Sequence, residues 1–398
     1  MQGLLISDPT SQPRKGCLHI EEDRIIAVEL GHTTSSARGT VIDYGEQFLF
    51  PGLIDTHCHL CLPGDGTPAE EFLKTAAPDS IVDVGCANAR HALSRGITSL
   101  RDLGSPQDLA FTVRKRLDLR DTPASRVFVS GAPLTAPGSH LAGFGGVVSH
   151  RAEMIQRIKD LAGRGADVIK VIASGSGGPG QQAGLPFSSQ DLVCIAEHAH
   201  ASGLPVTAHV TSPASIEACL NAGFDGLEHV GFWMPDGAVS YGEDLVRRME
   251  RAQTFVAPTI QAIYRTWREL PHQTEEDKAR RHRTFEDTVD VVRHLSEHDL
   301  RFVSGSDAGW LLNPFGDLRL GLQLLVEAGV SLTAALQSAT TTAAQALNKA
   351  GHLGCLVPAA QADFLVLQQN PLEGVDALDS LTDVYVGGQR VDRSSDQE

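Results

Sequence analysis

The residues of this sequence that are suited to chemistry begin with two histidines separated by one position. His57 and His59 flank Cys58 directly after an apolar run. Residues i and i+2 of an extended chain point to the same side, about 6.6–7 Å apart. Two imidazoles at that separation are able to bind one ion through nitrogens about 2.0–2.1 Å from it. The pair therefore indicates either a metal site or two histidines that line a polar cavity, and Cys58 points the other way.

Three further candidate ligands occur singly: His209, His229 and Asp307. Each has a structural alternative, a hydrogen-bonded core histidine for the first two and a helix N-cap for Asp307. Glu228 is expected to face away from the site, as a structural partner rather than a ligand. Four histidines and one aspartate around a common point would suit zinc, manganese, iron or cobalt.

Lys170 interrupts the apolar run 167–172. A buried protonated lysine is costly to desolvate, so the amine needs an ion pair or a side chain that reaches water. A different solution is carboxylation by CO₂, because the resulting carbamate carries a negative charge and two oxygens that can bridge two cations. A buried lysine with a lowered pKa is the nucleophile that this modification needs.

The elements that must position these residues are eight apolar runs that alternate with helical patterns. The runs are 48–55, 97–102, 126–130, 167–173, 205–210, 225–230, 254–258 and 301–307, with helical patterns such as 151–164, 189–202, 213–222 and 243–251 between them. Eight strands alternating with helices predict a parallel sheet closed into a barrel, whose active sites lie at the carboxyl ends of the strands. No Gly-x-Gly-x-x-Gly follows the first run, which argues against a dinucleotide-binding open sheet.

Length and charge exclude several classes of function. The chain has 398 residues, a net charge of −16 and only 5% aromatic residues. This charge would repel nucleic acids and anionic membrane surfaces.

No apolar run reaches the roughly 18 residues of a membrane span, and no secretory signal is recognised, so a cytoplasmic location is expected. The seven scattered cysteines do not form a disulfide framework.

In this order and spacing, the motifs resemble those of the amidohydrolase superfamily. The resemblance is carried by residues 50–59, 96–104, 165–170, 208–209, 227–229, 305–309 and 362–367, and it covers about residues 16–390. It is closest to the prolidase-like and imidazolonepropionase-like metal-dependent hydrolases, which cleave dipeptides, N-acyl amino acids and related amides or carbamates. The resemblance implies an α/β fold: a distorted (β/α)₈ TIM barrel over residues 51–350, beside a small β-sandwich domain formed by residues 1–50 and 351–398.

The same resemblance implies two divalent metal ions, with zinc expected. The implied ligands are His57, His59 and Asp307 for one ion and His209 and His229 for the other, with Lys170, carboxylated on its Nζ atom, as the bridge. A hydroxide between the ions would attack the carbonyl, with Asp307 as general base and then general acid. His140 matches a family histidine near the substrate, although residues 137–139 depart from the usual motif and a loop hydrogen bond is its alternative.

The expected substrate is a small amide or carbamate with a free carboxylate on the leaving side. The apolar loop 310–315 favours an apolar or aromatic group in it, and Tyr264 and Arg265 are expected to reach the barrel mouth, where Arg265 would bind the carboxylate unless it is a solvated loop residue. A mononuclear deaminase of the same superfamily is one alternative, but a single-metal site has no need of Lys170 as a bridging ligand. A non-catalytic scaffold or binding protein is the other alternative, but such a relative should have lost ligands, and here every motif position is filled. A small-molecule substrate and a homo-oligomer are expected, with no nucleic-acid or membrane partner.

Overall fold

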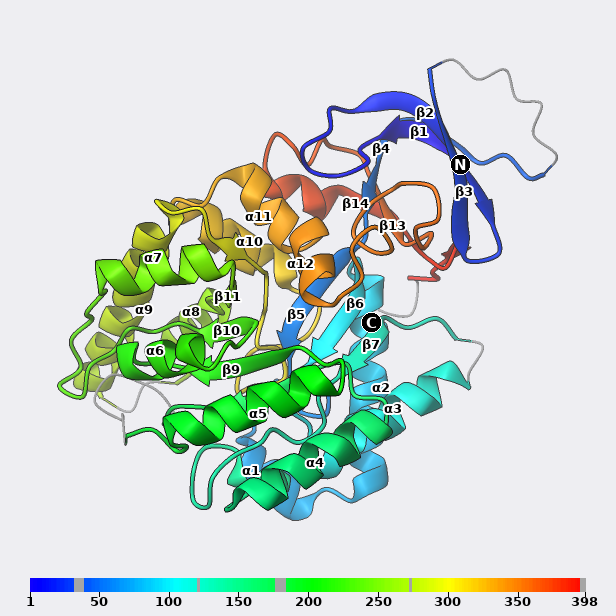
Figure 1. Ribbon diagram of the computed structural model, residues 1–398. Coiled ribbons are helices and arrows are strands. Elements are labelled where there is room, and N and C mark those ends of the chain that lie inside the picture. The colour runs from blue at the N-terminus through cyan, green and yellow to red at the C-terminus, as the bar shows by residue number, and fades with distance from the viewer. Residues whose placement is uncertain (32–38, 120–121, 176–183, 272–273, 394–398) are drawn as a thin grey trace.

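Two parts of an α/β fold are visible in the computed structural model, which describes residues 1–31, 39–119, 122–175, 184–271 and 274–393 (Figure 1). One part is a barrel of parallel strands surrounded by helices, and the other is a sheet built from both ends of the chain. The predicted α/β class and TIM-barrel architecture are confirmed. Within the described residues, no helix combines the length and apolar character that crossing a membrane requires.

Each of the eight predicted runs contains a barrel strand, and all pairings between these strands are parallel. The run 48–55 is divided, because residues 48–51 belong to β4 of the terminal sheet, and the run 301–307 is a strand only over its first two residues. They are β5 (Leu53–Cys58), β6 (Ile97–Asp102), β7 (Arg126–Val129), β8 (Ile169–Ile172), β9 (Val206–Val210), β10 (Gly226–His229), β11 (Phe255–Ala257) and β12 (Arg301–Phe302). The ladder is interrupted twice, after β7 and after β12. Isolated parallel bridges from Leu134 to Val171 and from Cys58 to Ala308 span these two seams. The barrel is therefore closed but distorted.

The helices follow from amphipathic patterns and caps. They are α1 (Ala69–Thr75), α2 (Pro78–Ser94), α3 (Leu109–Asp118), α4 (Arg151–Gly163), α5 (Ser189–Ala201), α6 (Pro213–Asn221), α7 (Glu243–Ala252), α8 (Ile260–Arg268), α9 (Glu275–Ser296), α10 (Leu318–Glu327), α11 (Leu332–Ser338) and α12 (Thr341–Ala346), with 3₁₀ helices η1 (Pro106–Asp108), η2 (Ala142–Phe144) and η3 (Val375–Ser380). In α4, Met154, Ile158 and Leu161 are buried on one face. Ser188 begins α5 with a capping box to Asp191, which satisfies backbone N–H groups at the helix start.

Both termini contribute to one seven-stranded sheet with the order β15-β14-β13-β4-β1-β2-β3. Its strands are β1 (Gln2–Leu5), β2 (Arg14–Glu21), β3 (Arg24–Leu30), β4 (Asp43–Pro51), β13 (Phe364–Leu367), β14 (Leu381–Val386) and β15 (Gln389–Arg390). The two ends of the chain share this sheet, as the resemblance implied. Its strands all lie before Gly52 or after Asp363, which supports the division at residues 50 and 351 that we still propose.

The sheet connects to the barrel through Gly52, between β4 and β5. A Cβ atom at Gly52 would lie 2.2 Å from Oγ1 of Thr98, so only glycine fits here without displacing β6. This close approach fixes where β5 enters the barrel, and therefore where His57 emerges at its other end.

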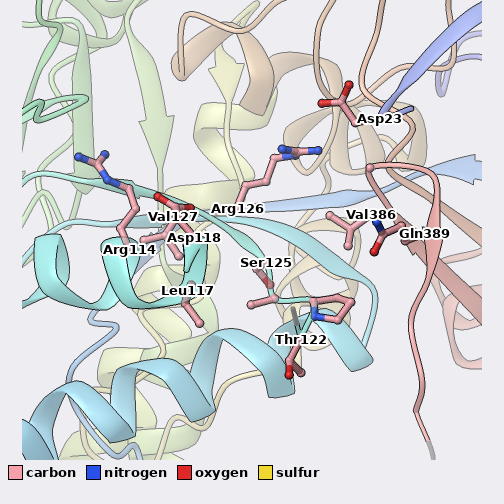
Figure 2. A pocket seen from close by; sticks show the side chains of 13 residues that line it. Asp23, Arg114, Leu117, Asp118, Thr122, Ser125, Arg126, Val127, Val386 and Gln389 are labelled. Carbon is pink, nitrogen blue, oxygen red and sulfur yellow. The ribbon is translucent and has the colours of Figure 1, made fainter. Parts of the chain in front are cut away.

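A cavity of about 540 Å³ lies between the barrel and the terminal sheet, on the side where β7 begins (Figure 2). It is lined by residues of α3 and β7 on one side and of β14 and β15 on the other. Its Arg126 already pairs with Asp363, with Nε 2.7 Å from Oδ2. None of the predicted ligands lines it, so the chemistry must be sought at the opposite ends of the strands.

Candidate active site

A second cavity, of about 400 Å³, opens at the carboxyl ends of the barrel strands. All six predicted metal ligands and His140 line it, although their strands are far apart in sequence. The residues are His57, His59, His140, Lys170, His209, His229 and Asp307. The carboxyl ends of parallel strands share one face of a closed barrel, so residues that follow these strands converge there.

His57, His59 and Asp307 form the tightest group in this cavity. Oδ1 of Asp307 lies 3.2 Å from Nε2 of His59 and 3.5 Å from Nε2 of His57. The ligand atoms of the three residues all lie within 4.8 Å of one another, and all three side chains are buried. Two imidazole nitrogens and a carboxylate oxygen in this arrangement are a donor set that suits a divalent metal ion.

Each of the four candidate histidine ligands has one ring nitrogen in contact with a hydrogen-bonding group of the protein. Nδ1 of His57 lies 2.8 Å from Glu228, and Nδ1 of His59 lies 2.9 Å from the Gly104 carbonyl oxygen. The other two contacts are Nδ1 of His229 to Oγ1 of Thr259 at 2.8 Å, and Nε2 of His209 to the Gly175 carbonyl oxygen at 3.1 Å. Donation of one N–H fixes the tautomer of a neutral imidazole and leaves the other nitrogen free to bind a metal.

The position of Glu228 differs from the expectation that it faces away from the site. Its carboxylate is fully buried inside the barrel, where Oε1 accepts hydrogen bonds from Arg101 and Thr207 and Oε2 accepts one from His57. Both Glu228 and the adjacent His229 face inward, because His229 has a φ of 72° that breaks the alternation of side chains along β10. Glu228 is a structural partner, as expected, but its partner is a candidate ligand.

Lys170 is 2% exposed, and its Nζ atom has no hydrogen-bond partner in the described part of the chain. Nε2 of His57 and Oδ1 of Asp307 are likewise buried without a hydrogen bond. Buried polar atoms are normally paired, so three unpaired ones at one cavity indicate a missing partner. Burial lowers the pKa of Lys170 to about 8, although the charges of Glu228 and Asp307 act in the opposite direction.

Burial and charge also set the protonation of the other ligands. Burial holds the pKa values of His57, His209 and His229 well below the ordinary range, which favours the neutral imidazole. Burial acts in the same sense on His59, but the negative charge of the neighbouring Asp307 carboxylate outweighs it and raises the pKa of His59. For Asp307, burial favours the acid, but the interactions with His57 and His59 outweigh it and place the pKa below the usual range.

Backbone strain is concentrated where the strands end at this cavity. His229, Val230, Thr259 and Asp307 all have positive φ angles, between 47° and 72°. Such conformations are uncommon for residues other than glycine, and most of all for β-branched ones, and they cluster at functional sites. Close packing adds a further constraint, because a Cβ atom at Gly305 would lie 2.5 Å from the Cβ of His57.

His140 lies beside the candidate ligands. The centre of its ring is 5.0 Å from that of His209 and 5.5 Å from that of Trp310. Burial lowers the pKa of His140 to about 4. Trp310 also contacts His59, with 5.7 Å between ring centres. This tryptophan therefore packs between the ligand cluster and His140 and forms one wall of the cavity.

The expectation that Tyr264 and Arg265 reach the mouth is not supported, because neither lines the cavity. Tyr264 packs edge-on against Trp267 and Phe285, and the Arg265 guanidinium pairs with Glu269 and Asp317. The reason is the orientation of α8. Residues three to four positions apart share one side of a helix, and the side of α8 that faces the cavity carries Ile263 and Thr266, so Tyr264 and Arg265 lie on other sides.

Several residues of the site were missed at the level of sequence. Arg280, Arg281 and Thr284 of α9 line the cavity, as do Trp233 and Ile172. Arg281 donates to the carbonyl oxygens of Thr266 and Leu270. Four of them lie in a helix or a strand, but the periodic pattern of such an element does not tell which face meets the cavity, and Trp233 lies in the segment between β10 and α7.

Comparison with known proteins agrees with this geometry. A family model described as "Amidohydrolase family" matches residues 48–391. An uncharacterised protein of Mycobacterium tuberculosis is 30% identical over 224 residues, which are 56% of this chain and 52% of that protein, so the chain spans about half the length of this relative. Ochratoxinase of Aspergillus niger is 26% identical over 429 residues, covering 97% of this chain and 85% of that protein.

Solved structures show the same fold. A Xaa-Pro dipeptidase with bound methionine in its active site superposes with a TM-score of 0.83 at 20% identity, covering 98% of both chains. The structure of A. niger ochratoxinase gives a TM-score of 0.80 at 24% identity, covering 98% of this chain and 94% of that one. With a family model that spans most of its length and the same fold in these structures, the chain belongs to the amidohydrolase family.

Proposed function

We propose that this protein is a binuclear metal-dependent hydrolase that cleaves an amide-type C–N bond in a small molecule. The observation that carries the proposal is the set of three buried atoms without hydrogen bonds, Nε2 of His57, Nζ of Lys170 and Oδ1 of Asp307. They lie at the cavity where the barrel strands end. A bound cation would satisfy Nε2 of His57 and Oδ1 of Asp307. Carboxylation of Lys170 would convert its unpaired amine into a carbamate whose oxygens could bind the cations.

The proposed ligands divide into two sets. His57, His59 and Asp307 would hold one ion, and His209 and His229 the other, with carboxylated Lys170 between them. Zinc is proposed because imidazole and carboxylate ligands suit it. Two divalent ions at such a site lower the pKa of a coordinated water and polarise a carbonyl oxygen. The ring contact between His209 and His229, with 4.4 Å between centres, supports their assignment to one ion.

Asp307 is the proposed general base and then general acid. Its backbone N–H donates to the His57 carbonyl oxygen at 2.7 Å, which fixes the loop after β12 against β5. The carboxylate is held as an anion beside His59, so it is able to take a proton from the attacking water. The same group would then deliver that proton to the leaving nitrogen, which departs poorly as an anion.

The cavity also supports a class of substrate. Leu141, Ile172, Trp233, Ile263, Trp310 and Leu311 give it apolar walls, which favours an apolar or aromatic group. We propose His140 as a residue that contacts the carbonyl or the carboxylate of a small amide or carbamate. Arg280 and Arg281 line the cavity in place of Arg265, although Asp277 pairs with both. A Xaa-Pro dipeptidase and an ochratoxinase among the similar proteins agree with a C–N bond in a small molecule.

The test is hydrolysis of a panel of N-acyl amino acids, dipeptides, carbamates and lactones by the zinc-loaded protein. We expect turnover of at least one C–N substrate, and loss of that turnover on treatment with a chelator and in the Asp307→Asn variant. A protein that binds its metals and cleaves none of the C–N substrates would contradict the proposal. Ammonia release from an amino-substituted ring, with one metal per chain, would instead establish the deaminase.

A further inference from the structure

A second cluster of potential ligands lies outside the barrel mouth, where the first residue of α7 comes close to the last turn of α9 and the residues after it. His294 is in the last turn of α9, and His298 lies just beyond the end of this helix, with 5.5 Å between the centres of the two rings. Glu243, the first residue of α7, faces both of them. Its Oε2 atom lies 3.6 Å from Nε2 of His294 and 3.8 Å from Nε2 of His298.

These three groups converge without bonding to one another. The distances exceed those of a hydrogen bond, and Nε2 of His294 is enclosed by protein with no hydrogen-bond partner among the described residues. The other oxygen of Glu243 is occupied, because Nε of Arg247 donates to Oε1 at 2.8 Å. Oε2 is thereby left facing the two histidines, and the three ligand atoms lie within 4.8 Å of one another.

We propose that Glu243, His294 and His298 form a divalent metal site that is separate from the catalytic cavity. Two imidazoles and one carboxylate suit Zn²⁺, with water as the fourth ligand. Ligands about 2.0–2.2 Å from a tetrahedral ion lie roughly 3.3–3.5 Å apart. The two nitrogen–oxygen pairs therefore need to close by only a few tenths of an ångström, which small side-chain rotations supply.

The surroundings of the cluster favour a cation. Oε2 of Glu250 lies 3.9 Å from Nδ1 of His298, and Oε1 of the same carboxylate accepts the backbone N–H of Asp299 at 3.1 Å. On the other histidine, Oε2 of Glu297 lies 3.9 Å from Nδ1 of His294. At 3.9 Å these carboxylates do not hydrogen-bond to the rings, but their negative charge behind the two imidazoles favours a bound cation.

An ion at this position joins the start of α7 to the end of α9. The same helix α9 forms part of the wall of the catalytic cavity through Arg280, Arg281 and Thr284, near its other end. The proposed site therefore holds in place a helix that shapes the cavity, without touching the cavity itself.

The test counts ions on the full chain after its tightly bound metals have been loaded and loose metal removed. Wild-type protein, His294→Gln and His298→Ala are dialysed to equilibrium against free Zn²⁺ near neutral pH, and bound zinc is measured by elemental analysis. We expect the wild type to hold one ion per chain more than either variant. This difference does not depend on how many ions the catalytic cavity holds, so the result is independent of the proposed function.

The matched control is His282→Ala. His282 lies on the same helix with its Nδ1 atom 3.7 Å from a single carboxylate, that of Glu286, so this variant should bind as much zinc as the wild type. Zinc should also raise the melting temperature of the wild type more than that of His294→Gln or His298→Ala, because an ion that binds only the folded chain stabilises it. Equal zinc counts in all four proteins, or an equal loss in His282→Ala, overturn the proposal. If His298→Ala does not fold, the comparison of wild type with His294→Gln decides.

Discussion

Nδ1 of His57 lies 2.8 Å from Oε2 of Glu228, across the interior of the barrel from β5 to β10. The same carboxylate is held by Arg101, whose Nη2 atom is 3.1 Å from Oε1, and by the hydroxyl of Thr207 at 2.6 Å. Burial raises the cost of leaving any of these groups unpaired. The contact therefore fixes both the tautomer and the orientation of a candidate metal ligand from below the cavity.

Replacing Glu228 with glutamine tests this positioning role. Glutamine has nearly the same shape, but one of its two ends is an NH₂ group that repels either the His57 N–H or the Arg101 guanidinium. We expect zinc affinity to fall by about 10- to 100-fold, measured by competition with a chelator of known affinity. Glu197→Gln, on the exterior helix α5, is the control. Unchanged affinity in Glu228→Gln would show that the contact serves the fold alone.

The metal content should be two ions per chain in the catalytic cavity, because the ligands fall into two sets. Elemental analysis of His57→Ala and of His209→Ala should show loss of metal and of activity together. The barrel should remain folded in both, since its core is apolar, and circular dichroism checks this. Full activity with one ion per chain would rule out the binuclear centre. The ion proposed at Glu243 is counted separately through its own variants.

Lys170→Ala should be nearly inactive, because it removes the proposed bridging carbamate. Short carboxylic acids added to this variant should restore part of the activity, since they supply two oxygens at the same place. Lys170→Gln is a useful comparison, because its bulk blocks added acid while it provides no anionic bridge. Activity at the wild-type level in Lys170→Ala would exclude an essential bridge.

Asp307→Asn should lower kcat by about 10²- to 10⁴-fold, the usual contribution of general acid–base catalysis. The asparagine keeps the shape of the side chain, so the ion held by His209 and His229 should stay bound. Substrates with better leaving groups should lose less activity, because they depend less on proton delivery to the nitrogen. A kcat equal to that of the wild type would remove Asp307 from the proton transfers.

The carboxylate of the substrate should matter more than its exact acyl group. We expect an N-acyl amino acid with an aromatic part to have a higher kcat/KM than its methyl ester or amide analogue. If Arg281 contributes to recognition of the carboxylate, Arg281→Lys should reduce the difference in kcat/KM between the free acid and its ester or amide. Arg265 lies outside the cavity, so Arg265→Lys should leave this difference unchanged. Equal kcat/KM for the free and blocked compounds would refute the carboxylate preference, and turnover of esters or lactones alone would refute the amide.

The sequence by itself determined the elements and the group of residues that they bring together. The run 97–102 is β6 as predicted, and the pattern 151–164 is α4 apart from its last residue. Local periodicity and capping decide such elements, because both depend on neighbours within a few positions. Once eight parallel strands close into a barrel, residues such as His57 and Asp307 that follow different strands must meet at one end.

Only the tertiary structure decided which way particular side chains face. Strand alternation alone places Glu228 and His229 on opposite sides of β10, whereas the left-handed backbone at His229 turns both inward. In α8 the helical pattern is equally compatible with any rotation about the axis. Packing of Tyr264 against Trp267 and of both against Phe285 of α9 turned Arg265 away from the cavity and brought Arg281 to it. These side-chain orientations depend on packing between segments that are far apart in the sequence. A local pattern of residues does not contain the energies of such contacts.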